Sequence, residues 1–155
     1  MIRRYGEPVH FGRRYRVRVG AYAILNRNGA VLLTHQEYPE QEFQLPGGGM
    51  DTGESLIQAL HREVLEETGW RIASPRRIGA FRRFTYMPEY DLWAEKICHV
   101  FLARPVRLHG APAEPGHSAV WTTPKVACHI LADQGSRAFV AQHFIGCRHL
   151  PAVRP

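Results

Sequence analysis

The chain has 155 residues, of which 45% are hydrophobic and 22% charged, and its formal net charge is +6. These values predict one globular domain over residues 1–155, with a basic lead-in over residues 1–14, and they exclude a disordered chain. No apolar run approaches the roughly 18 residues of a membrane span. The basic start lacks the apolar segment of a signal peptide. We therefore expect a cytoplasmic protein that makes no membrane contact.

The three cysteines support the same compartment. Cys98, Cys128 and Cys147 lie far apart, and their spacing matches neither a metal site nor a redox pair. We expect all three to be reduced thiols.

The first half of the chain alternates in the way that strands do. Residues 15–25 predict a strand, residues 26–29 a turn, and residues 30–35 a second strand that completes a hairpin. A polar loop over residues 36–42 leads to a short strand over residues 43–45. Next come three consecutive glycines, Gly47 to Gly49, which allow a backbone to approach a ligand closely.

A helix is predicted over residues 54–68, with Gly69 as its stop. Leu56, Ala59, Leu60 and Val64 form its apolar stripe, and three glutamates at 63, 66 and 67 lie along one edge of that stripe. Like charges at these spacings destabilise a helix by a few tenths of a kcal/mol per pair. A divalent cation would remove this cost, because hard cations prefer oxygen ligands. A solvated acidic face is the alternative, and the adjoining glycine-rich turn favours the metal site.

The second half predicts more strands and two short helices. Residues 70–72, 77–86, 92–103 and 119–122 read as extended, residues 124–131 as a helical turn, and residues 136–144 as a terminal helix. Residues 92–103 carry apolar side chains on both faces, which indicates a central strand. This order predicts an α/β fold, with a mixed sheet covered by helices on both faces.

From Gly48 to Trp70 the sequence resembles the Nudix box of MutT-like Nudix hydrolases. The family pattern is G-x5-E-x7-R-E-U-x-E-E-x-G-U, where U is a bulky aliphatic residue, and every fixed polar and glycine position is matched. The one departure is Trp70 at the last position, where a bulky apolar residue is retained. The resemblance implies an α/β/α sandwich and metal-dependent hydrolysis of a nucleoside diphosphate linked to another group.

The resemblance also implies a set of site residues. It places Mg²⁺ or Mn²⁺ on the three box glutamates and on the backbone carbonyl of Gly47, and it gives Arg62 and Glu54 structural roles. The glutamates in question are Glu63, Glu66 and Glu67. We expect Glu63 to be the general base, although a glutamate in a downstream loop serves in some family members. Glu114, in the loop over residues 108–120, is therefore a candidate additional ligand or base, unless it is simply solvated.

The substrate is less well defined by the sequence. A nucleoside triphosphate or a dinucleoside polyphosphate is favoured. Arginine clusters could attract such a polyanion, or could simply be solvated. Tyr86 and Pro88 match markers of two different substrate groups, so they do not decide between them. Five aromatic residues could stack on a base, although core packing is the more common role: Phe81, Phe84, Tyr86, Tyr90 and Trp93. The alternatives are a non-catalytic nucleotide-sensing module and a hydrolase of RNA 5′ ends. Oligomeric state is not predicted.

Overall fold

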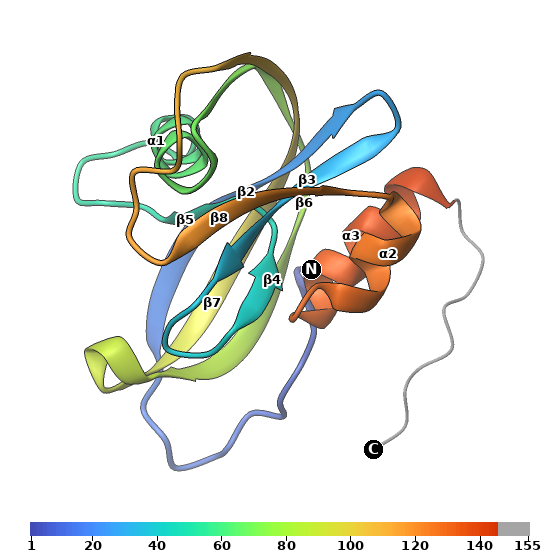
Figure 1. Cartoon of the computed structure of the whole chain (residues 1–155). Coiled ribbons are helices and arrows are strands. Elements are labelled where there is room, and N and C mark those ends of the chain that lie inside the picture. The colour runs from blue at the N-terminus through green and yellow to red at the C-terminus, as the bar shows by residue number, and fades with distance from the viewer. Residues whose placement is uncertain (146–155) are drawn as a thin grey trace.

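The computed structural model describes residues 1–145, so the prediction for Cys147 lies outside the described residues. An eight-stranded mixed sheet carries helix α1 (Leu56–Thr68) on one face. Helices α2 (Pro124–Ile130) and α3 (Gln134–Phe144) pack on the opposite face (Figure 1). This arrangement confirms the predicted α/β/α sandwich with a mixed sheet. Cys98 and Cys128 are free and buried, as expected for reduced thiols.

The sheet is organised around two long parallel strands, β2 and β7. In sheet order the main strands are β1 (Arg3–Arg4), β6 (Trp70–Met87), β7 (Leu92–Leu108), β2 (Arg16–Arg27), β3 (Ala30–Gln36) and β4 (Glu42–Gln44). Two further strands lie off this path: β5 (Gly47–Gly49) pairs with β2, and β8 (His117–Thr122) pairs with β3. Because β7 lies between β6 and β2, the prediction of a central strand is confirmed.

Strand β2 serves two partners along its length. Its residues 20–22 pair with the glycine strand β5, and its last two residues pair with β3. The β2–β3 turn consists of Asn28 and Gly29, both at positive φ (52° and 77°), as a two-residue hairpin of type I′ requires. The predicted hairpin is therefore confirmed, and β2 fixes the glycine strand at the side of the sheet.

Three element boundaries differ from the sequence prediction. The lead-in contains the short strand β1, which pairs with β6 at Phe81 and Arg82. The two predicted segments 70–72 and 77–86 form one strand, because register shifts near Ser74 and Ile78 absorb the irregular residues and let pairing resume. Strand β7 continues five residues past position 103, to Leu108, opposite the start of β6.

Two hydrophobic cores hold the helices to the sheet. On one face Leu60 and Val64 of α1 pack against Ala21 and Ala23 of β2. On the other face residues of α2 and α3 pack against Phe81 and Val100, among others. A short helix η1 (Pro88–Tyr90) connects β6 to β7. Burial of its apolar stripe fixes the rotation of α1, and this determines where its glutamates lie.

Candidate metal-binding site

Helix α1 begins two residues later than predicted. Ser55 caps it: its hydroxyl accepts a hydrogen bond from Gln58 N (3.2 Å), and the Gln58 side chain accepts one from Ser55 N (2.8 Å). This capping box places Glu54 in the preceding loop, outside the helix, which corrects the predicted start at residue 54. The buried side chains of Leu60 and Val64 confirm the predicted stripe.

Arg62 organises the acidic residues around it. Its Nε and Nη2 donate to the two carboxylate oxygens of Glu54, both at 2.9 Å, in the bidentate geometry that a guanidinium favours. Its Nη1 donates to Glu63 (2.8 Å) and Glu66 (3.2 Å), and its Nη2 also reaches the carbonyl of Gly49 (3.0 Å). The hydrogen bonds from Arg62 lower the pKa of Glu54 to about 2, helped by the backbone N–H of Asp51. The anionic partners raise the pKa of Arg62, despite its partial burial.

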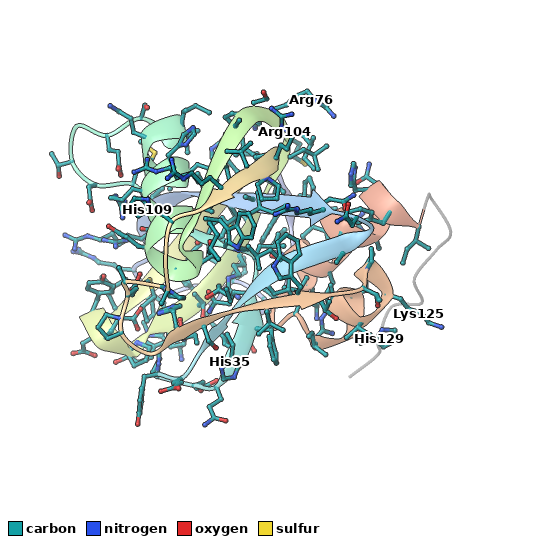
Figure 2. The ribbon with its side chains drawn as sticks, turned by 45° about the horizontal axis from the view of Figure 1, so that its top comes forward. His35, Arg76, Arg104, His109, Lys125 and His129 are labelled. Atoms are coloured by element: carbon teal, nitrogen blue, oxygen red, sulfur yellow. The ribbon has the colours of Figure 1, made fainter. Side chains whose placement is uncertain are left out.

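Three carboxylates meet beside this arginine. One oxygen from each of Glu63, Glu66 and Glu114 lies within 4.8 Å of the others. The loop before β8 supplies Glu114, because the N–H groups of Ala113 and Glu114 both donate to the carbonyl of Glu66, at 2.8 and 3.0 Å. A further bond from His109 N to Gly69 O (2.8 Å) holds the same loop at the end of α1, where Figure 2 labels His109. The structure therefore brings the candidate Glu114 to the box glutamates.

Gly48 allows Glu63 to approach the sheet. A Cβ added at residue 48 would lie 2.5 Å from the carboxyl carbon of Glu63, which is closer than real Cβ contacts. Only glycine leaves room for this carboxylate against strand β5. Burial raises the pKa of Glu63, although the hydrogen bond and charge of Arg62 oppose the shift.

Glu67 lies deeper than the three clustered carboxylates and is only 5% exposed. One of its oxygens accepts a hydrogen bond from Gly47 N (3.0 Å), and the other lies 3.6 Å from His117 Nε2. Burial raises the pKa of Glu67 well above its ordinary value, and the nearby charges of Glu63 and Glu114 add to the shift. Sequence reasoning gave His117 no role, and no motif marks it. Its contact with Glu67 arises from the position of β8 beside α1.

This donor set fits a hard divalent cation. The donors are all carboxylate oxygens that crowd together, and burial raises the pKa values of two of them, Glu63 and Glu67. A cation would reverse both unfavourable effects, like-charge repulsion and loss of hydration. Gly47 lies next to Glu67 through its N–H, and the role implied for its carbonyl remains a prediction.

The aromatic residues after the box have different surroundings. Phe81 and Phe84 are core residues (2% and 7% exposed), as their more common role predicts. Tyr86 and Tyr90 are exposed (41% and 55%). Trp93 lies beside Tyr86, with ring centroids 5.2 Å apart. The two tyrosines are therefore open to further contacts, while the phenylalanines are not.

Within residues 1–145, no helix has both the length and the apolar character that crossing a bilayer requires.

Comparison with known sequences gives consistent matches. Residues 14–143 match the profile of the NUDIX domain. The chain is 39% identical over 75 residues to a Bacillus subtilis protein named "Putative 8-oxo-dGTP diphosphatase", an alignment covering 48% of this chain and 50% of the relative. It is 32% identical over 128 residues to an RNA pyrophosphohydrolase of Baumannia cicadellinicola, covering 83% of this chain and 67% of the relative. The chain thus spans only about half the length of the first of these relatives.

Solved structures share the fold. A NUDIX hydrolase from Nitrosomonas europaea superposes with a TM-score of 0.69 at 19% identity, covering 90% of this chain and 97% of the other. A MutT NUDIX hydrolase from Burkholderia pseudomallei gives 0.65 at 22% identity, covering 82% and 98%. The profile match spans most of the chain and includes the box around Arg62, so the chain belongs to the Nudix hydrolase family.

Proposed function

We propose that this chain hydrolyses a pyrophosphate bond in a nucleoside diphosphate linked to another group, using Mg²⁺ or Mn²⁺. The observation that carries the proposal is the meeting of Glu63, Glu66 and Glu114 within 4.8 Å beside the buried Glu67. A nucleoside triphosphate or a dinucleoside polyphosphate is the favoured substrate. We place the reaction in the cytoplasm, where such nucleotides are abundant.

The metal would be held by the carboxylates of Glu63, Glu66 and Glu67, with Glu114 and the Gly47 carbonyl as further ligands. When bound, it supplies positive charge to the phosphate oxygens and acidifies a bound water. Arg62 acts on the geometry, because one guanidinium holds two of these carboxylates and a carbonyl of the glycine strand.

The proton of the attacking water needs an acceptor. Glu63 is our first candidate, because burial raises its pKa and a more basic carboxylate accepts a proton more readily. Glu114 is the second candidate, since it comes from a separate loop and reaches the same space. Glu67 is better suited to a fixed ligand position, because Gly47 N–H orients it from one side and His117 lies on the other.

Two alternatives deserve a direct comparison. The names of several relatives, including the Baumannia cicadellinicola protein, specify RNA pyrophosphohydrolase, which supports RNA 5′ ends as a second substrate class. A non-catalytic nucleotide sensor is the other alternative. It is less favoured because every glutamate of the box is present.

The test is a substrate screen with and without metal. Nucleoside triphosphates, dinucleoside polyphosphates, nucleotide sugars and 5′-triphosphorylated RNA are incubated with Mg²⁺, with Mn²⁺ or with EDTA, and released phosphate and pyrophosphate are measured. We expect turnover that requires metal and that is largely lost in Glu66→Gln. The exposed Glu7→Gln is the charge-matched control and should behave as the wild type. Turnover that persists in EDTA would refute the proposal, and binding without turnover would favour the sensor.

A further inference from the structure

Three cationic side chains line up across the sheet on the face opposite α1. Arg18 of β2 is paired directly with Lys96 of β7, and Lys96 is paired directly with Arg83 of β6. Directly paired residues project to the same face, so the three side chains form one row, which we call the cation row. The next row toward the core includes Cys98 and Phe81, both buried. The cation row therefore begins where the hydrophobic core under α2 and α3 ends.

The cation row has no anionic partner. Among residues 1–145, neither a hydrogen bond nor an ion pair joins any of its side chains to a carboxylate. Lys96 Nζ lies 5.9 Å from the ring centroid of Tyr22, and the Arg18 guanidinium lies 4.9 Å from that of Tyr90. Like charges placed directly opposite each other across strands destabilise a sheet. Their arrangement is therefore a cost that an anion would remove.

Lys96 and Arg83 line a recess of about 330 Å³, measured with its open mouth. Two carboxylates also line it, and both have other partners. Asp133 caps α3 by accepting a hydrogen bond from Ser136 N (2.7 Å), and Glu42 accepts one from the Gln44 side chain. Burial lowers the pKa of Lys96, and the adjacent charge of Arg83 lowers it further. The cations thus have the free hydrogen-bonding capacity, while the carboxylates are engaged.

The cation row lies next to the proposed metal site. A Cβ added at Gly49 would lie 3.8 Å from Arg18 Nη2, and the carbonyl of Gly49 accepts a hydrogen bond from Arg62 (3.0 Å). The neighbouring residue Gly48 faces the Glu63 carboxylate. The three-residue strand β5 thus has the acidic cluster on one side and the first cation of the row on the other.

We propose that Arg18, Lys96 and Arg83 bind a phosphate group of the substrate that lies outside the bond being cut. This inference rests on the proposed pyrophosphate hydrolysis, and it narrows the substrate to molecules that carry such an additional phosphate. Two sources offer this chemistry: a further phosphate of a dinucleoside polyphosphate, or the first phosphodiester of an RNA 5′ end. Three donors from three adjacent strands would hold it, with Arg18 at the side nearest the metal site.

A binding measurement tests the cation row without catalysis. Inorganic tripolyphosphate is titrated calorimetrically into the full chain in EDTA, so that metal cannot contribute. We expect salt-sensitive binding that weakens about tenfold in Lys96→Gln and in Arg83→Gln, since each removes one charge-assisted contact. The matched control is Arg104→Gln, on the same strand as Lys96. Arg104 lies in a separate basic groove with Arg76, at another edge of the sheet (Figure 2). It should bind as the wild type does.

Thermal unfolding checks that the variants remain folded. Without ligand, Lys96→Gln should melt at or above the wild-type temperature, because it removes like-charge repulsion. Tripolyphosphate should raise the melting temperature of the wild type more than that of Lys96→Gln. If Lys96→Gln does not fold, Arg18→Gln at the half-buried end of the row replaces it in the titration. Wild-type affinity in Arg18→Gln and Arg83→Gln, or a loss confined to Arg104→Gln, would overturn the inference.

Kinetics then identify the source of the phosphate. KM is compared between wild type and Lys96→Gln for a nucleoside triphosphate, a dinucleoside tetraphosphate and a 5′-triphosphorylated RNA. A rise in KM confined to the dinucleotide identifies the polyphosphate chain, and one confined to the RNA identifies the phosphodiester. An effect that depends on base identity and not on phosphate content would show that a nucleobase occupies the recess, and would refute the proposal. If the wild type binds tripolyphosphate through the cation row but hydrolyses nothing, only the proposed function fails.

Discussion

The two sides of strand β5 hold like charges of opposite sign, in different ways. On one side, Glu63 and Glu66 share a single guanidinium, that of Arg62, which also binds Glu54 with two hydrogen bonds. On the other side, the cation row of Arg18, Lys96 and Arg83 has no carboxylate bonded to it among residues 1–145.

The difference indicates two kinds of binding site. The acidic side is preorganised, because Arg62 and the loop tether at Glu66 fix the carboxylates before any ligand arrives. Preorganised ligands suit a metal ion that must be held in one geometry for chemistry. The cation row is held only by strand pairing, which suits recognition of a diffuse anion. We therefore expect substitutions on the acidic side to reduce turnover, and substitutions in the cation row to change mainly substrate affinity.

The largest expected effect is the loss of a clustered carboxylate. Glu63→Gln should reduce kcat about 10³-fold, because it removes both a charged oxygen ligand and the proposed base. Steady-state hydrolysis with saturating Mn²⁺ measures this, with Glu7→Gln as control. If Glu114→Gln reduces kcat as much while Glu63→Gln is mild, the assignment of the base moves to Glu114.

A smaller loss should follow when the glycine strand is widened. Gly48→Ala puts a methyl group 2.5 Å from the Glu63 carboxyl carbon, so that carboxylate must move. We expect kcat to fall about 10²-fold, the cost of displacing a reacting group by about 1 Å. Circular dichroism should show an unchanged fold. Full activity in this variant would mean that the close contact has no bearing on catalysis.

Arg62→Lys tests preorganisation directly. Lysine keeps the charge but cannot bind Glu54 with two parallel bonds. We expect Mn²⁺ affinity, measured by calorimetry, to fall about 10–100-fold, the usual cost of losing a group that orients metal ligands. Urea unfolding should show a stability loss of about 2 kcal/mol, from hydrogen bonds to charged groups. Unchanged metal affinity would show that Arg62 only stabilises the fold.

Stability should depend on pH in opposite ways for two sets of glutamates. The folded state raises the pKa values of Glu63 and Glu67, so the metal-free protein binds protons more tightly when folded. Its stability should therefore fall as pH rises above the ordinary glutamate pKa of about 4.3. Glu54 has its pKa lowered to about 2, so the stability it contributes is present above the ordinary value and is lost as pH falls toward 2.

The measurement is the melting temperature in EDTA at about pH 5 and about pH 8. We expect the lower value at the higher pH, and Mn²⁺ should restore it. Glu67→Gln should flatten the dependence, since it removes the most buried of these carboxylates. A melting temperature that rises across this range in EDTA, with no response to metal, would contradict the account of the acidic side.

Sequence alone predicted the parts of the site that lie in one segment. Helical spacing placed Glu63 and Glu66 together, and the buried stripe of α1 confirmed the face they adjoin. The start of α1 was predicted too early, because Glu54 reads as a helix former, while the Ser55–Gln58 capping box decides the boundary.

Contacts between distant segments were beyond prediction. Glu114 reaches the cluster through two backbone bonds to the Glu66 carbonyl, and backbone bonds leave no mark in residue identity. The cation row depends on the register of three strands, and a shift of one residue would send its side chains to opposite faces. The acidic motif was therefore visible in the sequence, while the row beside it required the paired sheet.

The most direct test of the account is the position of manganese in crystals of the wild-type protein. Anomalous diffraction from crystals soaked in Mn²⁺ should show a peak surrounded by carboxylate oxygens of Glu63 and Glu66, on the Arg62 side of strand β5. No peak there at high Mn²⁺ concentration, with these carboxylates ordered and still bonded to Arg62, would contradict the account.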